Sequence, residues 1–292
     1  MIASEARMMW DGAFGALLAG MIVAASLKGV TEMLLRTVGP VANYRRKPVA
    51  FPGGLVVPFG AVLGPILVGA LGGIHVDEPG RVGAYLLVIV GFGFAGFIDD
   101  MLGGHAQSGF SGHFGALSQG SFTTGVVKVF LGGAVSLGAV ELLAMAPVGI
   151  RDLMDAAVVA LSANLINLLD RRPGRAIKGF LLGFAALSMW FWMKDGKAGL
   201  ARMLSPAGSA LGAAIAFFPA DLGETAMLGD TGSNALGAAL GYCLLQMTVG
   251  WRTSALIVLV WLTLASERMS FGKVIEDNRV LRFIDRLGRE KE

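Results

Sequence analysis

Residues 91–100, GFGFAGFIDD, join an apolar run directly to two adjacent carboxylates, Asp99 and Asp100. A carboxylate beside hydrocarbon loses its hydration, so acids at a membrane edge usually face a wet cavity, a partner cation or a metal ion. The pair therefore predicts the floor of a cation and phosphate site, provided that other acids converge on the same face. Taken alone, such a pair is more often a solvated helix end.

The composition indicates an integral membrane protein. Of the 292 residues, 54% are hydrophobic and only 15% are charged, and the mean hydropathy of +0.67 exceeds what a soluble core of this size requires. The 43 glycines are spread through apolar runs, as in transmembrane helices whose backbones pack closely. The single cysteine, Cys243, excludes a disulfide framework and a cysteine-ligated metal site.

The apolar runs predict an all-α polytopic membrane bundle of about nine transmembrane helices. Most of the 24 Lys and Arg residues fall on one side of these helices, which the positive-inside rule assigns to the cytoplasm. The N terminus is then outside and the C terminus cytoplasmic. We expect 1–273 to form a single transmembrane catalytic domain and 274–292 a basic amphipathic cytoplasmic tail. The expected spans are 13–26, 55–73, 82–98, 122–142, 153–169, 177–193, 206–220, 233–249 and 254–266.

The tail pattern allows two interpretations. Val280, Phe283, Ile284 and Leu287 share one side of a possible helix, with arginines around the rest. Such a helix could lie along anionic lipid headgroups, or it could be a solvated helical tail. The pattern alone favours neither.

Four segments on the cytoplasmic side carry the candidate site. Asn164, Asn167 and Asp170 recur at a spacing that puts them on roughly one helix face approaching the cytoplasm. Asp230 precedes a helix start, whose free amides and positive dipole favour an anion. The segments are KPVAFPGG (47–54), FIDD (97–100), NLINLLD (164–170) and LGDTGS (228–233).

Each segment alone also has a purely structural explanation. Thr231 or Ser233 could cap the following helix, the two asparagines could join helices, and Lys47 could be a topology signal. Together, however, carboxylates from separate helices and nearby cations are the ingredients of a Mg²⁺–diphosphate site. These cations are Lys47, Lys128, Arg171, Arg172 and Arg175. His105 and His113, in a glycine-rich loop, are assigned no role.

This combination resembles the polytopic polyprenyl-phosphate sugar-1-phosphate transferases, which include the phospho-N-acetylmuramoyl-pentapeptide transferases and the N-acetylglucosamine-1-phosphate transferases. The resemblance runs in order from about residue 47 to residue 241. It implies transfer of a sugar 1-phosphate from a nucleotide diphosphate sugar to a polyprenyl phosphate, at the cytoplasmic face of the cell membrane. The implied cofactor is Mg²⁺, with Mn²⁺ as an alternative. No nucleic acid partner is expected, and the glycine-rich first span could support a homodimer.

The resemblance also implies residue roles. Asp99, Asp100 and Asp230 would be catalytic, with Asp99 the candidate base for the lipid phosphate and Asp100 and Asp230 the candidate metal ligands. The residues that would contact the substrates are Lys47, Lys128, Asn164, Asn167, Asp170, Arg171, Arg172 and Arg175.

The chain departs from the family pattern in two places. After the position of Asp170 the family usually reads Gly-x-Asp-Gly, whereas here RRPGR follows, and guanidinium groups match phosphate oxygens. The family's His-rich loop is replaced by SERMSFGKVIEDNR. An alternative is therefore a non-catalytic, family-like protein that binds a lipid phosphate or scaffolds a cell-envelope complex. A transporter is disfavoured, because its acids should lie near the bilayer midplane rather than at one edge.

Overall fold

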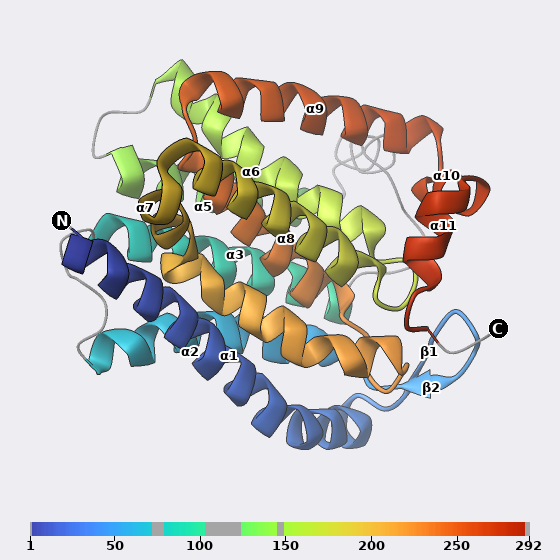
Figure 1. Cartoon of the computed structure of the whole chain (residues 1–292). Coiled ribbons are helices and arrows are strands. Elements are labelled where there is room, and N and C mark those ends of the chain that lie inside the picture. Colours follow the sequence, from blue (N-terminus) through green and yellow to red (C-terminus); the bar gives the residue numbers. More distant parts are fainter. Residues whose placement is uncertain (1, 72–78, 103–123, 145–148, 290–292) are drawn as a thin grey trace.

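The structure is a computed structural model that describes residues 2–71, 79–102, 124–144 and 149–289, and it is a bundle of long helices with one short hairpin (Figure 1). The first half contains α1 (Ile2–Thr37), β1 (Val41–Ala42), β2 (Pro48–Val49), a short 3-10 turn (Gly53–Leu55), α2 (Val56–Ala70), α3 (Pro79–Leu102) and α5 (Thr124–Ala144). The second half contains α6 (Ile150–Leu169), α7 (Arg175–Leu222), α8 (Gly229–Leu245), α9 (Val249–Arg268), α10 (Phe271–Asp277) and α11 (Arg279–Arg286).

Within the described residues, 7 helical segments are long and apolar enough to cross a membrane. The all-α polytopic membrane class predicted from the sequence is thus confirmed. Two of the expected spans, 177–193 and 206–220, both lie within α7, a 48-residue helix whose backbone leaves helical geometry at Gly196 and Ser205. Pro206 follows the second break, and a proline in a helix removes a hydrogen bond and clashes with the preceding turn.

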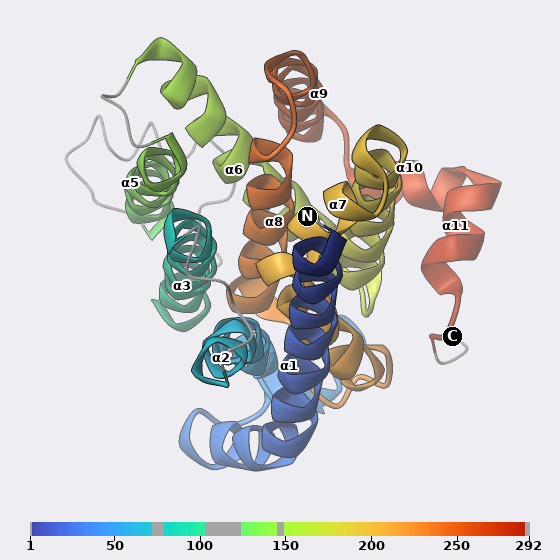
Figure 2. The ribbon, with the colours of Figure 1, turned by 60° about the vertical axis from the view of Figure 1, so that its left-hand side comes forward.

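The central element of the bundle is α8 (Figure 2), which packs against α3 and α6. Its apolar side chains point in all directions and are nearly all buried, as expected for a helix enclosed by other helices. The backbones approach closely where small residues allow it: a methyl group at Gly237 would lie 2.5 Å from the carbonyl oxygen of Ser162 on α6. This close packing fixes the start of α8 relative to α3 and α6.

One end of the bundle gathers the segments that the sequence singled out. The hairpin, the turn between α6 and α7, and helices α10 and α11 lie at the end opposite the start of α1 (Figure 1). Two short helices, α10 and α11, occupy most of the region where the tail is expected, and the first of them begins at Phe271. The side chain of Asn278 separates them and caps α11, accepting from the backbone N–H groups of Val280 at 3.0 Å and Leu281 at 3.1 Å.

Candidate active site

A lysine joins two of the predicted acids at this end of the bundle. The Nζ of Lys128, on α5, lies 3.3 Å from Oδ2 of Asp99 on α3 and donates a hydrogen bond to Oδ2 of Asp230 on α8. The same oxygen of Asp230 accepts from Nδ2 of Asn167, on α6, at 3.0 Å. Four separate helices therefore bring these side chains into one cluster, which we call the Lys128 cluster (Asp99, Lys128, Asn167 and Asp230).

Asp100 caps the start of α8 from a different helix. Its Oδ1 accepts from the backbone N–H of Asp230 at 2.9 Å, and its Oδ2 accepts from the N–H and the hydroxyl of Thr231 at 2.9 and 2.6 Å. The alternative explanation, a cap by Thr231 or Ser233, does not hold, because α8 already begins at Gly229 and both residues lie inside it. Ser233 instead donates to Oδ1 of Asn167 at 3.2 Å. A carboxylate thus satisfies free amides at the positive end of the helix.

Gly96 permits this capping, because the backbones of α3 and α8 lie close together beside it. A Cβ at Gly96 would lie 2.6 Å from the backbone nitrogen of Thr231. We expect Gly96→Ala to push the helices apart, to weaken the contacts of Asp100, and to destabilise the fold by about 1–3 kcal/mol. Thermal unfolding in detergent measures this. Gly133→Ala is the control, since a Cβ there meets nothing within 4 Å. Equal melting temperatures for the two variants would contradict the close approach.

Asp170 follows α6 and lies beside the Lys128 cluster. Burial, and then the negative charges of Asp221, Asp230 and Asp100, raise the pKa of its carboxyl group well above the usual value, although the backbone N–H of Gly229 donates to it. A buried carboxyl group with several negative charges nearby tends to bind a proton or a cation. The six residues Asp99, Asp100, Lys128, Asn167, Asp170 and Asp230 are therefore neighbours, and Asn164 is half-buried one turn before Asn167.

Asp170→Asn is expected to stabilise the protein at neutral pH. A carboxyl group whose pKa is raised by folding binds more protons in the folded than in the unfolded state, so it lowers stability as the pH rises above the unfolded value of about 3.9. Asparagine removes this loss, so the variant should melt at a higher temperature at pH 7, and the advantage should vanish near pH 4. Melting curves in EDTA from pH 4 to pH 8 test this. A variant that is less stable than the original chain at pH 7 would contradict it.

Asp221 is a site residue that the sequence did not single out. It is buried at the end of α7 and accepts from the backbone N–H of Gly174 at 2.7 Å and of Leu228 at 3.3 Å. It therefore ties the turn after Asp170 to the loop that leads into α8. The signal was present in FFPADLG, where an acid ends an apolar helix just as in FIDD.

Lys47 lies on the hairpin, which is attached to the loop before α8. The backbone N–H of Met227 donates to the carbonyl of Ala50 at 3.1 Å, and the N–H of Gly54 donates to the carbonyl of Met227 at 3.0 Å. The Nζ of Lys47 lies 3.9 Å from Oε2 of Glu224, a buried acid that also accepts from Nδ2 of Asn43 at 2.6 Å. Sequence reasoning missed Glu224, because nothing in its neighbourhood marks it as buried.

The three arginines after Asp170 have different surroundings. Arg175 is buried and binds Asp285 of α11 through two hydrogen bonds of 2.8 and 3.0 Å. Arg172 stacks over the ring of Tyr44, 4.3 Å from its centroid, and lies 3.8 Å from Glu276. Arg171 is exposed. Arg175 is therefore bound to α11. To contact a phosphate, the Arg175 guanidinium group would have to leave the Asp285 carboxylate.

The donor set suits a metal that is shared with substrate. Within the described ranges, no group of three or more His, Cys, Asp or Glu side chains is arranged to hold a metal ion. Mg²⁺, however, is usually bound by one or two carboxylates together with water and substrate phosphates. Asp99 and Asp230 direct oxygens at a single cation, the Lys128 ammonium group, and so could share an ion. Asp100 already accepts three hydrogen bonds, which makes Asp230 the better metal ligand of the two proposed.

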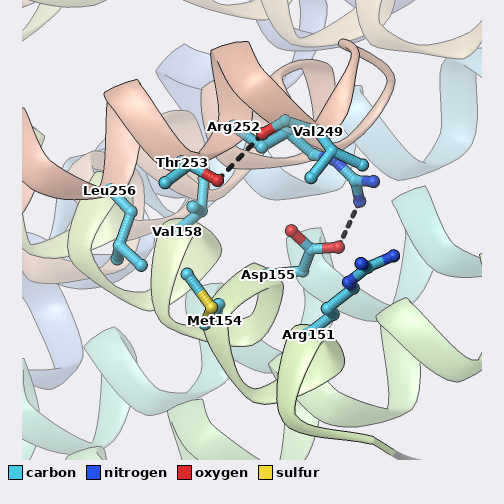
Figure 3. Close-up of a pocket in the computed structure, with 8 residues that line it drawn as sticks. All are labelled: Arg151, Met154, Asp155, Val158, Val249, Arg252, Thr253 and Leu256. Atoms are coloured by element: carbon cyan, nitrogen blue, oxygen red, sulfur yellow. Dashed lines mark hydrogen bonds and ion pairs between the residues drawn. The ribbon is translucent and has the colours of Figure 1, made fainter.

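A pocket elsewhere on the molecule is distinct from this site. It lies at the beginning of α6 and α9, and an ion pair between Arg252 and Asp155 spans it (Figure 3). Asp170 follows the opposite end of α6, so the pocket and the Lys128 cluster are a helix length apart. The lining residues are Arg151, Met154, Asp155, Val158, Val249, Arg252, Thr253 and Leu256. His105 and His113 lie outside the described residues.

The comparison with known proteins agrees with the motifs. No protein-family model matches the chain. Phospho-N-acetylmuramoyl-pentapeptide-transferase of Rhodopseudomonas palustris (strain BisB18) is 27% identical to it over 71% of this chain. The predicted resemblance is confirmed. The chain is similar to this transferase, and the match spans 62% of the transferase's length.

Proposed function

We propose that the protein transfers a sugar 1-phosphate, or a related phospho-alcohol, from a nucleotide diphosphate donor to a polyprenyl phosphate. The reaction depends on Mg²⁺ and gives a polyprenyl diphosphate-linked sugar. The observation that carries the proposal is the Lys128 cluster, in which side chains from α3, α5, α6 and α8 meet beside the capped start of α8. The similarity to a phosphotransferase supports the same reaction class.

The proposal includes a topology of about nine crossings, with the N terminus outside and the C terminus in the cytoplasm. The breaks in α7 divide it into two crossings, and α8, at 17 residues, is apolar and enclosed by other helices. The end of the bundle that carries the Lys128 cluster then faces the cytoplasm. Soluble nucleotide sugars are available on that side, and the lipid phosphate lies at the same membrane surface.

In the proposed reaction, an oxygen of the lipid phosphate attacks the sugar-bearing phosphorus of the donor, and a nucleoside monophosphate leaves. Asp99 either accepts a proton from the lipid phosphate or orients that phosphate. Lys128 offsets the negative charge of the phosphate groups beside Asp99. Asn167 orients the Asp230 carboxylate. A Mg²⁺ held by Asp230 and Asp99 would neutralise charge on the donor diphosphate. The proposed contacts to the substrate phosphates outside the Lys128 cluster are Lys47, Arg171 and Arg172.

The direct test incubates purified protein with polyprenyl phosphate, Mg²⁺ and a panel of UDP-, CDP-, GDP- and ADP-linked sugars. We expect one donor class to yield a lipid-linked product, and we expect Asp99→Asn to lower its rate of formation by roughly a hundredfold or more. Absence of product with every donor, or full activity of the variant, would refute the proposal. A protein that binds the lipid phosphate but neither Mg²⁺ nor any nucleotide would support the non-catalytic alternative.

A further inference from the structure

Helix α11 turns its apolar side away from the bundle. Val280, Phe283 and Leu287 follow one another along one side of this helix and its C-terminal cap, and their exposed fractions are 66%, 67% and 59%. A helix that packs on a protein in water normally buries its apolar side against that protein. The opposite orientation of α11 needs an explanation.

Polar contacts fix this orientation. The buried carboxylate of Asp285, on the inner side of α11, accepts from Arg175 at 2.8 and 3.0 Å and pairs with Arg289 at 2.5 Å. The Nζ of Lys178 donates to the carbonyl of Asp285 at 2.6 Å. Burial opposes the charged form, but hydrogen bonds and charges from the two arginines lower the pKa of the Asp285 carboxyl group below its usual value. The ionic contact is therefore kept at neutral pH, and the outward side of α11 is held in place.

The outward side has the composition of a helix that lies in a membrane interface. Arg279, Arg282 and Arg286 border the apolar residues and are exposed. Helices with an apolar face and arginines beside it lie in the plane of the membrane surface, with the apolar face at the boundary between headgroups and acyl chains. The position agrees: only α10 separates α11 from the end of α9, a candidate span, and α11 runs across the direction of α9 at that end of the bundle (Figure 1). In Figure 2 both short helices lie on the outside of the bundle.

We propose that α11 binds the surface of the surrounding bilayer, with Val280, Phe283 and Leu287 inserted and the three arginines on anionic headgroups. A second copy of the chain is the less suitable occupant. Its α11 would bring three further arginines to the contact, while Asp285, the one acid of this helix, is buried against Arg175. Arg289, just after α11, also donates to the carbonyl of Pro173 at 2.8 Å, so α11 is attached to the turn after Asp170.

Spin labels on the full chain in lipid nanodiscs test the proposal. In a Cys243→Ala background, Phe283→Cys and Arg282→Cys place a nitroxide on the apolar and the basic side of the same helix, about 100° apart. In nanodiscs with anionic lipid, we expect the label at 283 to be more accessible to oxygen than to a water-soluble nickel complex. The label at 282 should show the reverse. Val280→Cys provides a second probe of the apolar side if the label at 283 disturbs the fold.

The charge requirement is tested separately. Replacing the anionic lipid by phosphatidylcholine, or combining Arg279→Gln with Arg286→Gln, should raise the accessibility of the label at 283 to the nickel complex. Each arginine near an anionic surface contributes about a fivefold factor to membrane binding. Equal access of the nickel complex to both labels in anionic nanodiscs would show a solvated tail. Spin–spin broadening that depends on two copies per disc would show a contact between chains. Either result overturns the proposal.

Discussion

Asp230→Asn is expected to lower the transfer rate by roughly a hundredfold to a thousandfold. One carboxylate oxygen of Asp230 accepts hydrogen bonds from Lys128 and Asn167, and the backbone N–H of Asp230 donates to the carboxylate of Asp100. Asparagine keeps the shape of the side chain and its capacity to accept hydrogen bonds, but it removes the charge that would hold Mg²⁺ and, through that ion, the donor diphosphate. Initial rates at saturating substrates, with the melting temperature measured in parallel, give the comparison.

The matched control for this variant is Asp195→Asn. Asp195 is an exposed acid that pairs with Arg202 at the far end of the bundle. Its neutralisation changes the net charge of the chain equally but leaves the Lys128 cluster intact, so the rate should stay at the level of the original chain. Equal rates for the two variants would show that the acid at 230 takes no part in the reaction.

Lys128→Met is expected to produce the second large effect, in two separable readouts. The ammonium group is the cation that lies between Asp99 and Asp230, so its loss removes the positive charge that these two carboxylates share. In EDTA the variant should lose roughly 2 kcal/mol of stability. Mg²⁺ should then raise its melting temperature by more than it raises that of the original chain, because the ion can bind where the ammonium group was. Transfer activity should fall in both conditions.

Lys197→Met is the control, since Lys197 is exposed and lies near the break at Gly196, far from the Lys128 cluster. It should show neither the loss in EDTA nor the added response to Mg²⁺. If Lys128→Met responded to Mg²⁺ no more than this control, Asp99 and Asp230 would not form a site for a shared divalent ion.

The membrane class and the positions of the acids followed from the sequence because both depend on local pattern. Apolar runs of sufficient length predict spanning helices whatever their neighbours are. FIDD, NLINLLD and LGDTGS each put an acid at a helix end for the same reason. Residues 103–123, which include His105 and His113, lie outside the described residues, and the glycine-rich loop expected there stays a prediction.

The partner of each charge, by contrast, was decided only by the tertiary structure. Asp100 caps a helix that begins about 130 positions later in the chain, and Arg175 binds an acid 110 positions away. Sequence reasoning gave Arg175 to a substrate phosphate, because a guanidinium group fits a phosphate and a carboxylate equally well. Asp221 and Glu224 were missed, since burial depends on which helices pack together. Hydropathy is a property of neighbours along the chain, whereas the pairing of charges is a property of neighbours in space.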